Sequence, residues 1–502
     1  MISGVQRPPT QVACGRRVAS GESASLAHGT GRRSPRRSGL RGLLSCAPVA
    51  MTAILLTAPS QAQEMSTRDH ERAGLMLRTI EGEVRQRYYD STFTGVDATA
   101  HFAAARGQLR AARTNGEAFI VIAQSLVAFN DSHLYFVPPA RAAEVSYRWG
   151  LAFVGASCYV VAVDSVSAAA RFGVFIGDRV LSLDGWRPVR RELWAVGYLL
   201  RVLAPRAQVT LTLASPGEAP RDVRVPSLVR ERRRVQLLDF DRGSPELWDL
   251  IRSGEEDERL LQDEFVTVDD STLIWRMPSF RAAEQRIVGD SSLRWRIPPA
   301  VTADHPVDDG IRRARRHRSL VLDLRGNRGG DVSALTRLIG RIFPRDIHVG
   351  ELRERHRVDT LTARSRGGVF TGRLVVLVDS RSASASELLA RVVQLEQRGS
   401  VIGDRTAGAV RRSRGVTLSV GGNVGVSMYG LSVTDADVIM ADGGTLEGVG
   451  VRPDELLLPS GADLAAGRDP VLARALQLLG HPMDATQAGR LLSPGRHALD
   501  LW

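Results

Sequence analysis

The sequence predicts an α/β protein with a helical N-terminal region, a β-rich insert and a core in which strands and helices alternate. Three observations predict this class. After Ser66, apolar residues recur at three- and four-residue spacing. Short alternating runs such as "QVTLTLA" follow, and from Ser271 onward apolar strand-length runs alternate with amphipathic helices. Such alternation is typical of a parallel sheet that is covered on both faces.

The composition is that of a globular protein. The 502 residues are 43% apolar and 5% aromatic, which allows roughly two to four domains. The net charge is +12, yet all 67 basic residues are arginine and the chain contains no lysine. A polyanion site is one explanation of this charge, and a solvated surface is the other. Because no interleaved basic and aromatic pattern accompanies the arginines, we expect no nucleic-acid partner.

Residues 1–62 are expected to form a leader. The basic stretch "RRSPRRSGLRG" precedes the apolar run "LLSCAPVAMTAILLTAP", and small residues end at Ala62, as at a secretory cleavage site. The long basic region leaves open a downstream start, a twin-arginine signal or a lipoprotein signal. We therefore expect an exported protein, periplasmic or extracellular. No other segment reaches the ~18 consecutive apolar residues of a membrane span.

Five segments are expected after the leader. One of them contains "SAAARFGVFIGDRVLSLDGWRPV", a turn, a strand and the approach to a helix, and it resembles a PDZ domain. Another is charge-dense and compatible with helix, as linkers often are. We expect a helical cap at 66–140, a PDZ-like domain at 145–227, a charged linker at 228–265, the core at 266–480 and a tail at 481–502.

Two junctions between a strand and a helix carry candidate chemistry. The first is "LDLRGNRGG", Leu322 to Gly330, whose glycines allow close backbone approach and leave N–H groups free. The second is "VLVDSRSASASELLARVV", in which one serine is a candidate nucleophile. The alternative is that Ser382, Ser384 and Ser386 only cap a helix. The first loop has an alternative of its own as an ordinary turn.

Four motifs in order resemble the carboxy-terminal processing peptidases, a serine peptidase family that includes the tricorn core peptidases. The motifs are "LDLRGNRGG", "VLVDSRSASASELLARVVQ", "VIGDRTAGA" and "LEGVGVRPDELL". The resemblance implies a crotonase-like ββα core with a helical cap and an inserted PDZ-like domain. It also implies cleavage of unstructured polypeptide. Ser384 would be the nucleophile, and the backbone N–H groups of Gly329, Gly330 and Ala385 would form the oxyanion hole.

The resemblance departs from the lysine-dependent branch of the family, because Ala409 stands in "TAGAV" where that branch has its lysine. Arginine cannot act as the base, since its guanidinium stays protonated. The tricorn-like branch uses histidine, which implies His133 in "NDSHLYF" as the general base. Ser132 and Glu447 would then orient the imidazole. The alternatives are a filler role for His133 and a turn-holding role for Glu447. Asp131 could either cap a turn or orient His133 directly.

The remaining expectations concern substrate and partners. Trp149, Gly150 and Leu151 could receive the C terminus of a peptide at the edge of the PDZ-like domain. Arg325 could bind a substrate carboxylate or form a structural ion pair. The histidines and Cys158 lack ligand-type spacing, so we expect no metal and no cofactor. A homo-oligomer is possible. An inactive peptide-binding protein of the same fold is the alternative to a peptidase.

Overall fold

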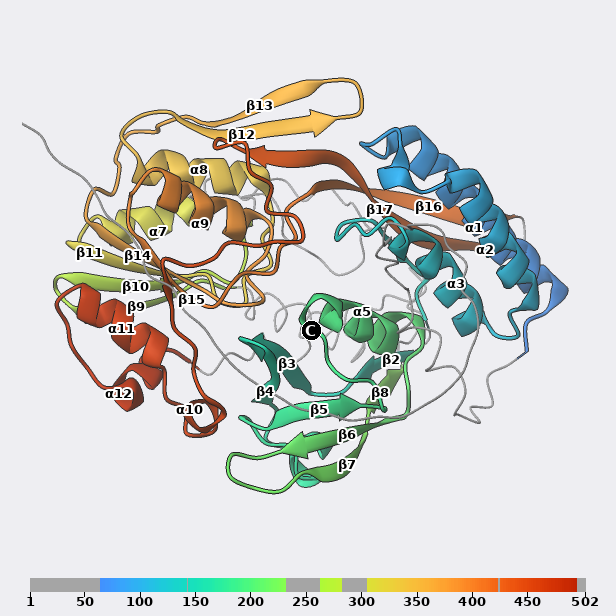
Figure 1. The fold of residues 1–502 in the computed structure, drawn as a ribbon, viewed down its shortest axis with the longest axis horizontal. Helices are drawn as coiled ribbons and strands as arrows, with labels where there is room; N and C mark the ends of the chain where they lie inside the picture. Colours follow the sequence, from blue (N-terminus) through green and yellow to red (C-terminus); the bar gives the residue numbers. More distant parts are fainter. Residues whose placement is uncertain (1–63, 142, 232–261, 282–304, 423–424, 494–502) are drawn as a thin grey trace, which may run out of the picture. The chain divides into compact units, whose positions relative to one another are not determined.

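The computed structural model describes residues 64–141, 143–231, 262–281, 305–422 and 425–493. All of them belong to one compact unit. The expected leader and most of the expected linker lie outside these ranges. The described residues form helices and sheets in the mixture that the sequence predicts, and the α/β class is confirmed (Figure 1).

Three helices form the N-terminal region: α1 (Thr67–Arg87), α2 (Ala98–Ala111) and α3 (Asn115–Val127). Each helix begins after a residue whose side chain accepts a hydrogen bond from a backbone N–H of the first turn, and these residues are Ser66, Asp97 and Thr114. Their buried apolar side chains pack into one cluster with residues of a β-sheet. The apolar spacing therefore predicts these helices correctly.

The next domain is a five-stranded antiparallel sheet in the order β3-β4-β5-β6-β7. Its strands are β3 (Trp149–Val154), β4 (Ser157–Val163), β5 (Arg179–Leu183), β6 (Gln208–Ala214) and β7 (Arg221–Pro226). The helical segments are α4 (Ala168–Arg171), η3 (Arg190–Glu192), α5 (Leu193–Tyr198) and η4 (Leu199–Leu203). We call this unit the β3–β7 domain. Its core is separate from those of the rest of the chain.

A short strand pair flanks the β3–β7 domain. β2 (Ala143–Ser146) precedes it, and β8 (Leu228–Glu231) follows it and pairs antiparallel with β2. The expected linker, 228–265, therefore starts with four residues of strand, because the chain leaving β7 pairs with the chain that enters the domain. Residues 232–261 of that linker lie outside the described ranges.

The core contains a six-stranded sheet in the order β18-β15-β14-β11-β10-β9. All neighbours are parallel except β9, which runs antiparallel to β10. The strands are β9 (Glu264–Asp269), β10 (Thr272–Arg276), β11 (Ser319–Asp323), β14 (Arg373–Val378), β15 (Ser400–Gly403) and β18 (Glu455–Leu456). β11 is buried along its whole length, which explains why it reads as a continuous apolar run.

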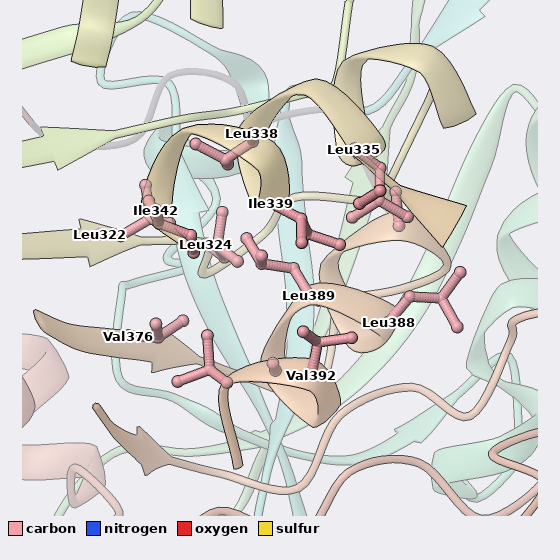
Figure 2. Packing of buried hydrophobic residues seen from close by; sticks show 14 of the residues in the cluster. Leu322, Leu324, Leu335, Leu338, Ile339, Ile342, Val376, Leu388, Leu389 and Val392 are labelled. Carbon is pink, nitrogen blue, oxygen red and sulfur yellow. The ribbon is translucent and has the colours of Figure 1, made fainter. Parts of the chain in front are cut away.

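Helices cover both faces of this sheet, as predicted. On one face lie α7 (Pro306–Ala314), α8 (Val332–Ile342) and α9 (Ala385–Leu395). Figure 2 shows Leu338 and Ile339 of α8 and Leu389 of α9 packed above Leu322 and Val376 of the sheet. On the other face lie α11 (Pro470–Leu478) and α12 (Ala485–Gly489), which pack against the alternate residues of the same strands.

A second sheet joins the N-terminal helices to the core. Its order is β1-β17-β12-β13, and β16 also pairs with β17. The strands are β1 (Tyr135–Val137), β12 (Ile347–Glu354), β13 (Val358–Ala363), β16 (Arg412–Gly422) and β17 (Gly425–Met440). β1 pairs antiparallel with β17, with Tyr135 opposite Ser432. His133 stands two residues before β1, so this pairing fixes its position relative to the core.

The C-terminal part contains more helix than the sequence indicated. After Leu457, only the stretch "DPVLARALQLL" has helical apolar spacing, and it forms α11. Two further helices, α10 (Gly461–Ala465) and α12, are each five residues long, too short for apolar periodicity to be recognised. In the ranges that the structure describes, no helix combines the length and the apolar composition needed to cross a membrane.

We expect Leu338→Ala to lower the free energy of unfolding by about 2–5 kcal/mol, because it leaves a cavity between α8, α9 and the sheet. Leu338 has no exposed surface, whereas Leu75 on α1 is 42% exposed. Leu75→Ala is therefore the matched control and should change stability by less than about 0.5 kcal/mol. Urea unfolding followed by circular dichroism measures both. Equal effects would contradict the packing described here.

Candidate active site

The two expected strand-to-helix junctions meet at one edge of the six-stranded sheet. β11 and β14 are neighbouring parallel strands, with Asp323 opposite Leu377, so their carboxyl ends lie side by side. Loop 324–331 follows β11 and leads to α8, and loop 379–384 follows β14 and leads to α9. Backbone hydrogen bonds join them, since Ala383 N donates to Asn327 O at 2.9 Å. The glycine-rich and serine-rich motifs therefore form one surface.

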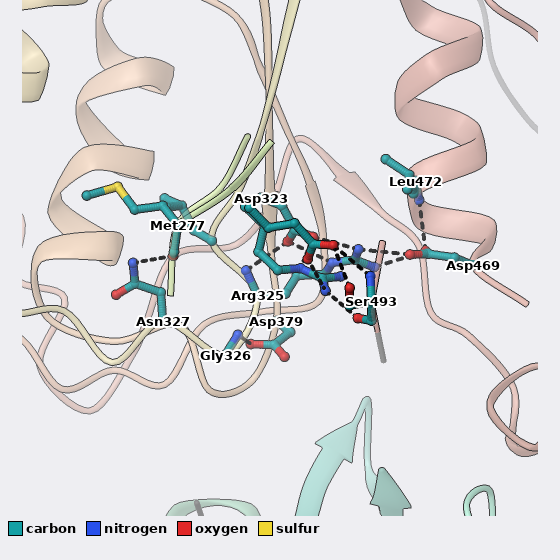
Figure 3. A network of polar contacts seen from close by, with 12 residues as sticks. Met277, Asp323, Arg325, Gly326, Asn327, Asp379, Asp469, Leu472 and Ser493 are labelled. Carbon is teal, nitrogen blue, oxygen red and sulfur yellow. Dashed lines mark hydrogen bonds and ion pairs between the residues drawn. The ribbon is translucent and has the colours of Figure 1, made fainter. Parts of the chain in front are cut away.

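A buried ionic network anchors the first loop (Figure 3). Arg325 donates to Asp323 from Nε and Nη2 at 2.9 and 2.8 Å, and to Asp469 at the start of α11 at 2.9 and 2.8 Å. Burial opposes charge on Asp323, yet the neighbouring guanidinium of Arg325 holds the pKa of that carboxyl below its usual range. Both charges are therefore paired. The Arg325 guanidinium is engaged in this network. Its contacts therefore match a structural ion pair, the alternative to a role in binding a substrate carboxylate.

The three serines of the second loop differ in their surroundings. Ser382 and Ser386 are fully buried, and their hydroxyls donate to Leu324 O at 2.8 Å and to Asn327 O at 3.0 Å. Both side chains thus fasten the second loop to the first. Ser384 is half-buried, and its hydroxyl donates no hydrogen bond to any described residue. Ser384 is the serine of this trio whose oxygen is available for chemistry.

Ser384 also has an unusual backbone. Its φ is 56° and its ψ is −119°, a region that costs a residue with a side chain about 1–3 kcal/mol. Gly329 lies directly against it, with a φ of 94°. A Cβ on Gly329 would be 2.6 Å from Ser384 Cβ, so no other residue fits without a shift. The glycine-rich loop therefore approaches the serine as closely as backbone can.

The three expected oxyanion donors are not equivalent. Gly329 N–H donates to Asn327 Oδ1 at 2.8 Å and is already engaged. Gly330 N–H and Ala385 N–H make no hydrogen bond to the described residues. Ala385 is the first residue of α9, where backbone N–H groups have no partner within the helix. Two donors beside Ser384 are therefore available to a developing negative charge.

Glu387 joins Ser384 to loop 406–411. Its buried carboxylate accepts from Ser384 N at 3.0 Å, Thr406 Oγ1 at 2.6 Å, Gly408 N at 2.7 Å and Ala409 N at 2.9 Å. Burial raises the pKa of Glu387 to about 7, although the four hydrogen bonds oppose the rise. The sequence around Glu387 does not signal this role, because the three partners in loop 406–411 lie 19 to 22 residues away.

His133 lies on the other side of the same loop. Its Nδ1 forms a 2.7 Å hydrogen bond with Ser132 Oγ, and its Nε2 makes none to the described residues. Glu447 Oε1 accepts from Ser132 N at 3.3 Å, and Oε2 accepts from Val410 N at 2.8 Å. Burial lowers the pKa of His133, and the Glu447 carboxylate opposes this. The structure therefore brings His133, Ser132 and Glu447 together.

Asp131 supports the backbone of this histidine. Its Oδ1 accepts from His133 N at 2.9 Å and from Thr434 Oγ1 at 2.7 Å. Its Oδ2 accepts from Tyr88 Oη at 2.9 Å. None of its hydrogen bonds involves the imidazole. Of the two roles considered for Asp131, holding the turn is the one that its contacts match.

Loop 406–411 connects the two halves of the site. Ser384 N also donates to Ala409 O at 2.9 Å, and the next residue, Val410, donates to Glu447. A continuous set of short contacts thus leads from Ser384 through the loop to Glu447, Ser132 and His133. No hydrogen bond joins His133 to Ser384 directly in the described part of the chain.

Trp149, Gly150 and Leu151 form the start of β3, the edge strand of the β3–β7 domain. The side chains of Trp149 and Leu151 are buried in the core of that domain. The far end of β3 touches the site, because Ser380 Oγ donates to Phe153 O at 2.6 Å. Within the described ranges, no group of three or more His, Cys, Asp or Glu side chains is arranged to hold a metal ion.

The chain was compared with known families and structures. Residues 276–457 match the model of peptidase family S41. This part of the chain is an S41 peptidase domain. The resemblance drawn from the four motifs is thereby confirmed. Ser384, Glu447 and the expected oxyanion donors lie inside the matched range, whereas His133 and Ser132 precede it.

Individual proteins agree with this assignment. The chloroplastic C-terminal processing peptidase of Tetradesmus obliquus is 24% identical over 370 residues, covering 68% of this chain and 68% of that protein. The carboxyl-terminal-processing protease of Synechocystis is 32% identical over 163 residues, which are 32% of this chain and 36% of that protein. The crystal structure of mature CPAF shares the fold, with a TM-score of 0.58 and 16% identity over 80% of this chain and 95% of that one.

We expect Glu387→Gln to lower the free energy of unfolding by about 1–3 kcal/mol, since an amide nitrogen would face buried N–H donors. Glu396 ends the same helix and forms an ion pair with the exposed Arg345. Glu396→Gln is the matched control, and it should stay within about 1 kcal/mol of the wild type. Thermal and urea unfolding measure both variants. A neutral Glu387→Gln would show that the four contacts do not hold the loop.

Proposed function

We propose that the chain is an exported serine endopeptidase that cleaves extended or unfolded polypeptides. Ser384 would form the acyl-enzyme, and His133 would act as general base. The observation that carries the proposal is the pairing of an accessible, strained Ser384 with free N–H donors on one side of loop 406–411 and a half-buried His133 on the other. The printed names of the two relatives, both processing peptidases, support a polypeptide substrate.

The imidazole is suited to remove the serine proton. A hydroxyl must lose its proton as it attacks a carbonyl, so a neutral acceptor is required within reach. Burial lowers the pKa of His133 and keeps it neutral near pH 7. If Nδ1 carries the proton and donates to Ser132 Oγ, then Nε2 presents a lone pair. Loop closure on a bound polypeptide would bring that lone pair to Ser384 Oγ.

The charges that develop during attack have partners. The tetrahedral oxyanion would accept from Gly330 N–H and Ala385 N–H, and the start of α9 adds its dipole. The proton taken from Ser384 makes His133 cationic. Glu447, whose carboxylate favours that charged form, would stabilise the imidazolium while it waits to protonate the leaving amine. Ser132 would hold the ring orientation throughout.

The remaining parts would deliver the substrate. The β3–β7 domain, as a PDZ-like domain at 145–227, would receive a peptide along β3, with the backbone of Trp149, Gly150 and Leu151 near its C terminus. The contact of Ser380 with Phe153 O would report occupancy of that strand to the serine loop. The leader at 1–62 would direct export to the periplasm or the cell exterior.

The second candidate is an inactive peptide-binding protein on the same fold. One observation favours it: no hydrogen bond joins His133 and Ser384 among the described residues. Ala409 also offers no amine to either group. Catalytic contacts often tighten only with substrate, so this separation does not by itself decide the matter. Covalent labelling decides it, because a binder would not react.

We expect Ser384→Ala to abolish reaction with a fluorophosphonate probe and to lower peptide hydrolysis on the order of 10³-fold or more. The fold should be kept, because the Ser384 hydroxyl donates no hydrogen bond to the described residues and Ser384 N still donates to Glu387. Ser333→Ala, at an exposed serine of α8, is the matched control and should label like the wild type. Labelling that persists in Ser384→Ala would refute the nucleophile, and an unlabelled wild type would favour the binder.

We expect kcat/KM to rise with pH along an acidic limb whose midpoint lies below the ordinary histidine value of about 6.5. The base must be neutral, and burial lowers the pKa of His133, so activity should persist into mildly acidic solution. Glu387, with its pKa raised to about 7, is a second group that titrates here. NMR of the His133 Cε1–H resonance follows the imidazole alone. A kinetic midpoint that does not match it would rule out His133 as the base.

A further inference from the structure

We propose that Arg411 is a positioning residue that holds the His133 loop against loop 406–411. This inference rests on the proposed function, in which His133 is the base. It assigns to a side chain outside the serine and histidine motifs the task of orienting the imidazole. Arg411 follows Ala409 by two residues, so the loop that lacks an amine beside Ser384 carries a guanidinium directed to the opposite side.

The guanidinium of Arg411 binds the segment that carries His133. Its Nη1 donates to Asp131 Oδ2 at 2.9 Å, and the other oxygen of Asp131 accepts from His133 N. The Asp131 side chain is fully buried and that of Arg411 is 13% exposed, so water screens this pair little. The contact between Arg411 and Asp131 is specific, because leaving either of the two buried charges unpaired would cost free energy.

Two further contacts fix the guanidinium in place. Its Cζ lies 5.1 Å from the ring centroid of Tyr89, a cation–π arrangement. Its Nε lies 3.5 Å from Asp437 Oδ1 on β17, a long ion pair in which neither atom forms a hydrogen bond to the described residues. These neighbours come from the end of α1 and from the second sheet, respectively. The planar group is therefore held by three elements, which a flexible ammonium could not match.

The backbone of Arg411 reaches the second support of the histidine. Its N–H lies 3.4 Å from Glu447 Oε2, beside the shorter contact from Val410 N. Glu447 Oε1 accepts from Ser132 N, and Ser132 Oγ holds the imidazole. Arg411 thus contacts both carboxylates that fix the His133 segment, one through its side chain and one through its main chain.

Arg411 also affects the charge of the ring. The charged groups that face the imidazole are Glu447, Asp131 and Arg411. The two carboxylates favour the protonated ring, whereas the Arg411 cation opposes it. Removing the cation would leave Asp131 unpaired beside the histidine and raise the pKa of His133. A purely structural arginine would not change that pKa.

The experiment uses Arg411→Gln and the matched control Arg412→Gln. Arg412 is the next residue, with its side chain 26% exposed, and it donates to Asp435 at 2.8 Å and to Glu354 at 2.7 Å. It makes no hydrogen bond to Asp131 or Glu447 in the described ranges. A second pair, Arg411→Lys and Arg412→Lys, keeps both charges and serves if Arg411→Gln does not fold. Full-length protein is used, with the His133 resonance assigned by its loss in His133→Gln.

For Arg411→Gln we expect kcat/KM to fall on the order of 10²-fold. The acid-side kinetic midpoint and the NMR-measured pKa of His133 should both move to higher pH. Arg412→Gln should leave all three quantities near wild type. Arg411→Lys should keep the acid-side kinetic midpoint of the wild type, because the positive charge is retained. It should lower kcat/KM about 10-fold or more relative to Arg412→Lys, because an ammonium group cannot reproduce the planar set of N–H donors of a guanidinium.

The outcomes distinguish a failure of the role assigned to Arg411 from a failure of the proposed function, in which His133 is the base. If the pKa of His133 is the same in Arg411→Gln and the wild type, while wild-type kinetics follow His133, then the role of Arg411 is refuted and the peptidase mechanism stands. If the pKa of His133 moves but the kinetic midpoint does not, His133 is not the base, and the positioning role falls with the proposed function. Equal losses in the Arg411 and Arg412 variants would also overturn the inference.

Discussion

The candidate site depends on the hydrogen bonds that backbone N–H groups of loop 406–411 donate to Glu387 on one side and to Glu447 on the other. Ser384 lies in the loop that follows β14 of the six-stranded sheet, and His133 lies in the segment that follows the N-terminal helices. Among the described residues, no hydrogen bond joins the two side chains. Glu387 binds the loop from the side of Ser384, and Glu447 binds it from the side of His133. Each carboxylate satisfies several backbone N–H groups, so a segment without regular structure has a defined path.

Burial of charge restricts the conformations that are open to the surrounding loops. Asp323, Arg325 and Asp469 form a closed ionic network beneath the glycine-rich loop, and Glu387 collects four donors beneath the serine. Each such group costs free energy unless every polar atom finds a partner, so the arrangement tolerates few alternatives. This restriction can sustain the strained backbone of Ser384, whose conformation would relax in a looser loop.

In a chain without lysine, the side chains that supply permanent positive charge cannot also accept a proton. Guanidinium groups remain charged and bind carboxylates through two N–H donors, so Arg325 and Arg411 act as fixed cations in buried pairs. Neither can accept a proton. In the proposed mechanism the acceptor is the imidazole of His133, and the Arg411 cation opposes protonation of that ring. In this way the absence of lysine from the composition is matched by the geometry of the site, in which Arg325 and Arg411 are paired with carboxylates.

The sequence by itself determined the elements and the chemistry available to them. Apolar spacing located α1 to α3, the strands β10, β11 and β14 and the helices α8 and α9, because their burial imposes a local period. The resemblance of four motifs to a peptidase family implied Ser384 and His133, and the absence of lysine excluded an amine base. Only the tertiary structure decided which groups meet. The partners of Glu387, Asp131 and Arg411 lie far away in sequence, the pairing of β1 with β17 joins segments almost 300 residues apart, and Gly329 N–H was engaged by Asn327 rather than left free. Such contacts follow from how two sheets and their loops pack, which no local pattern records.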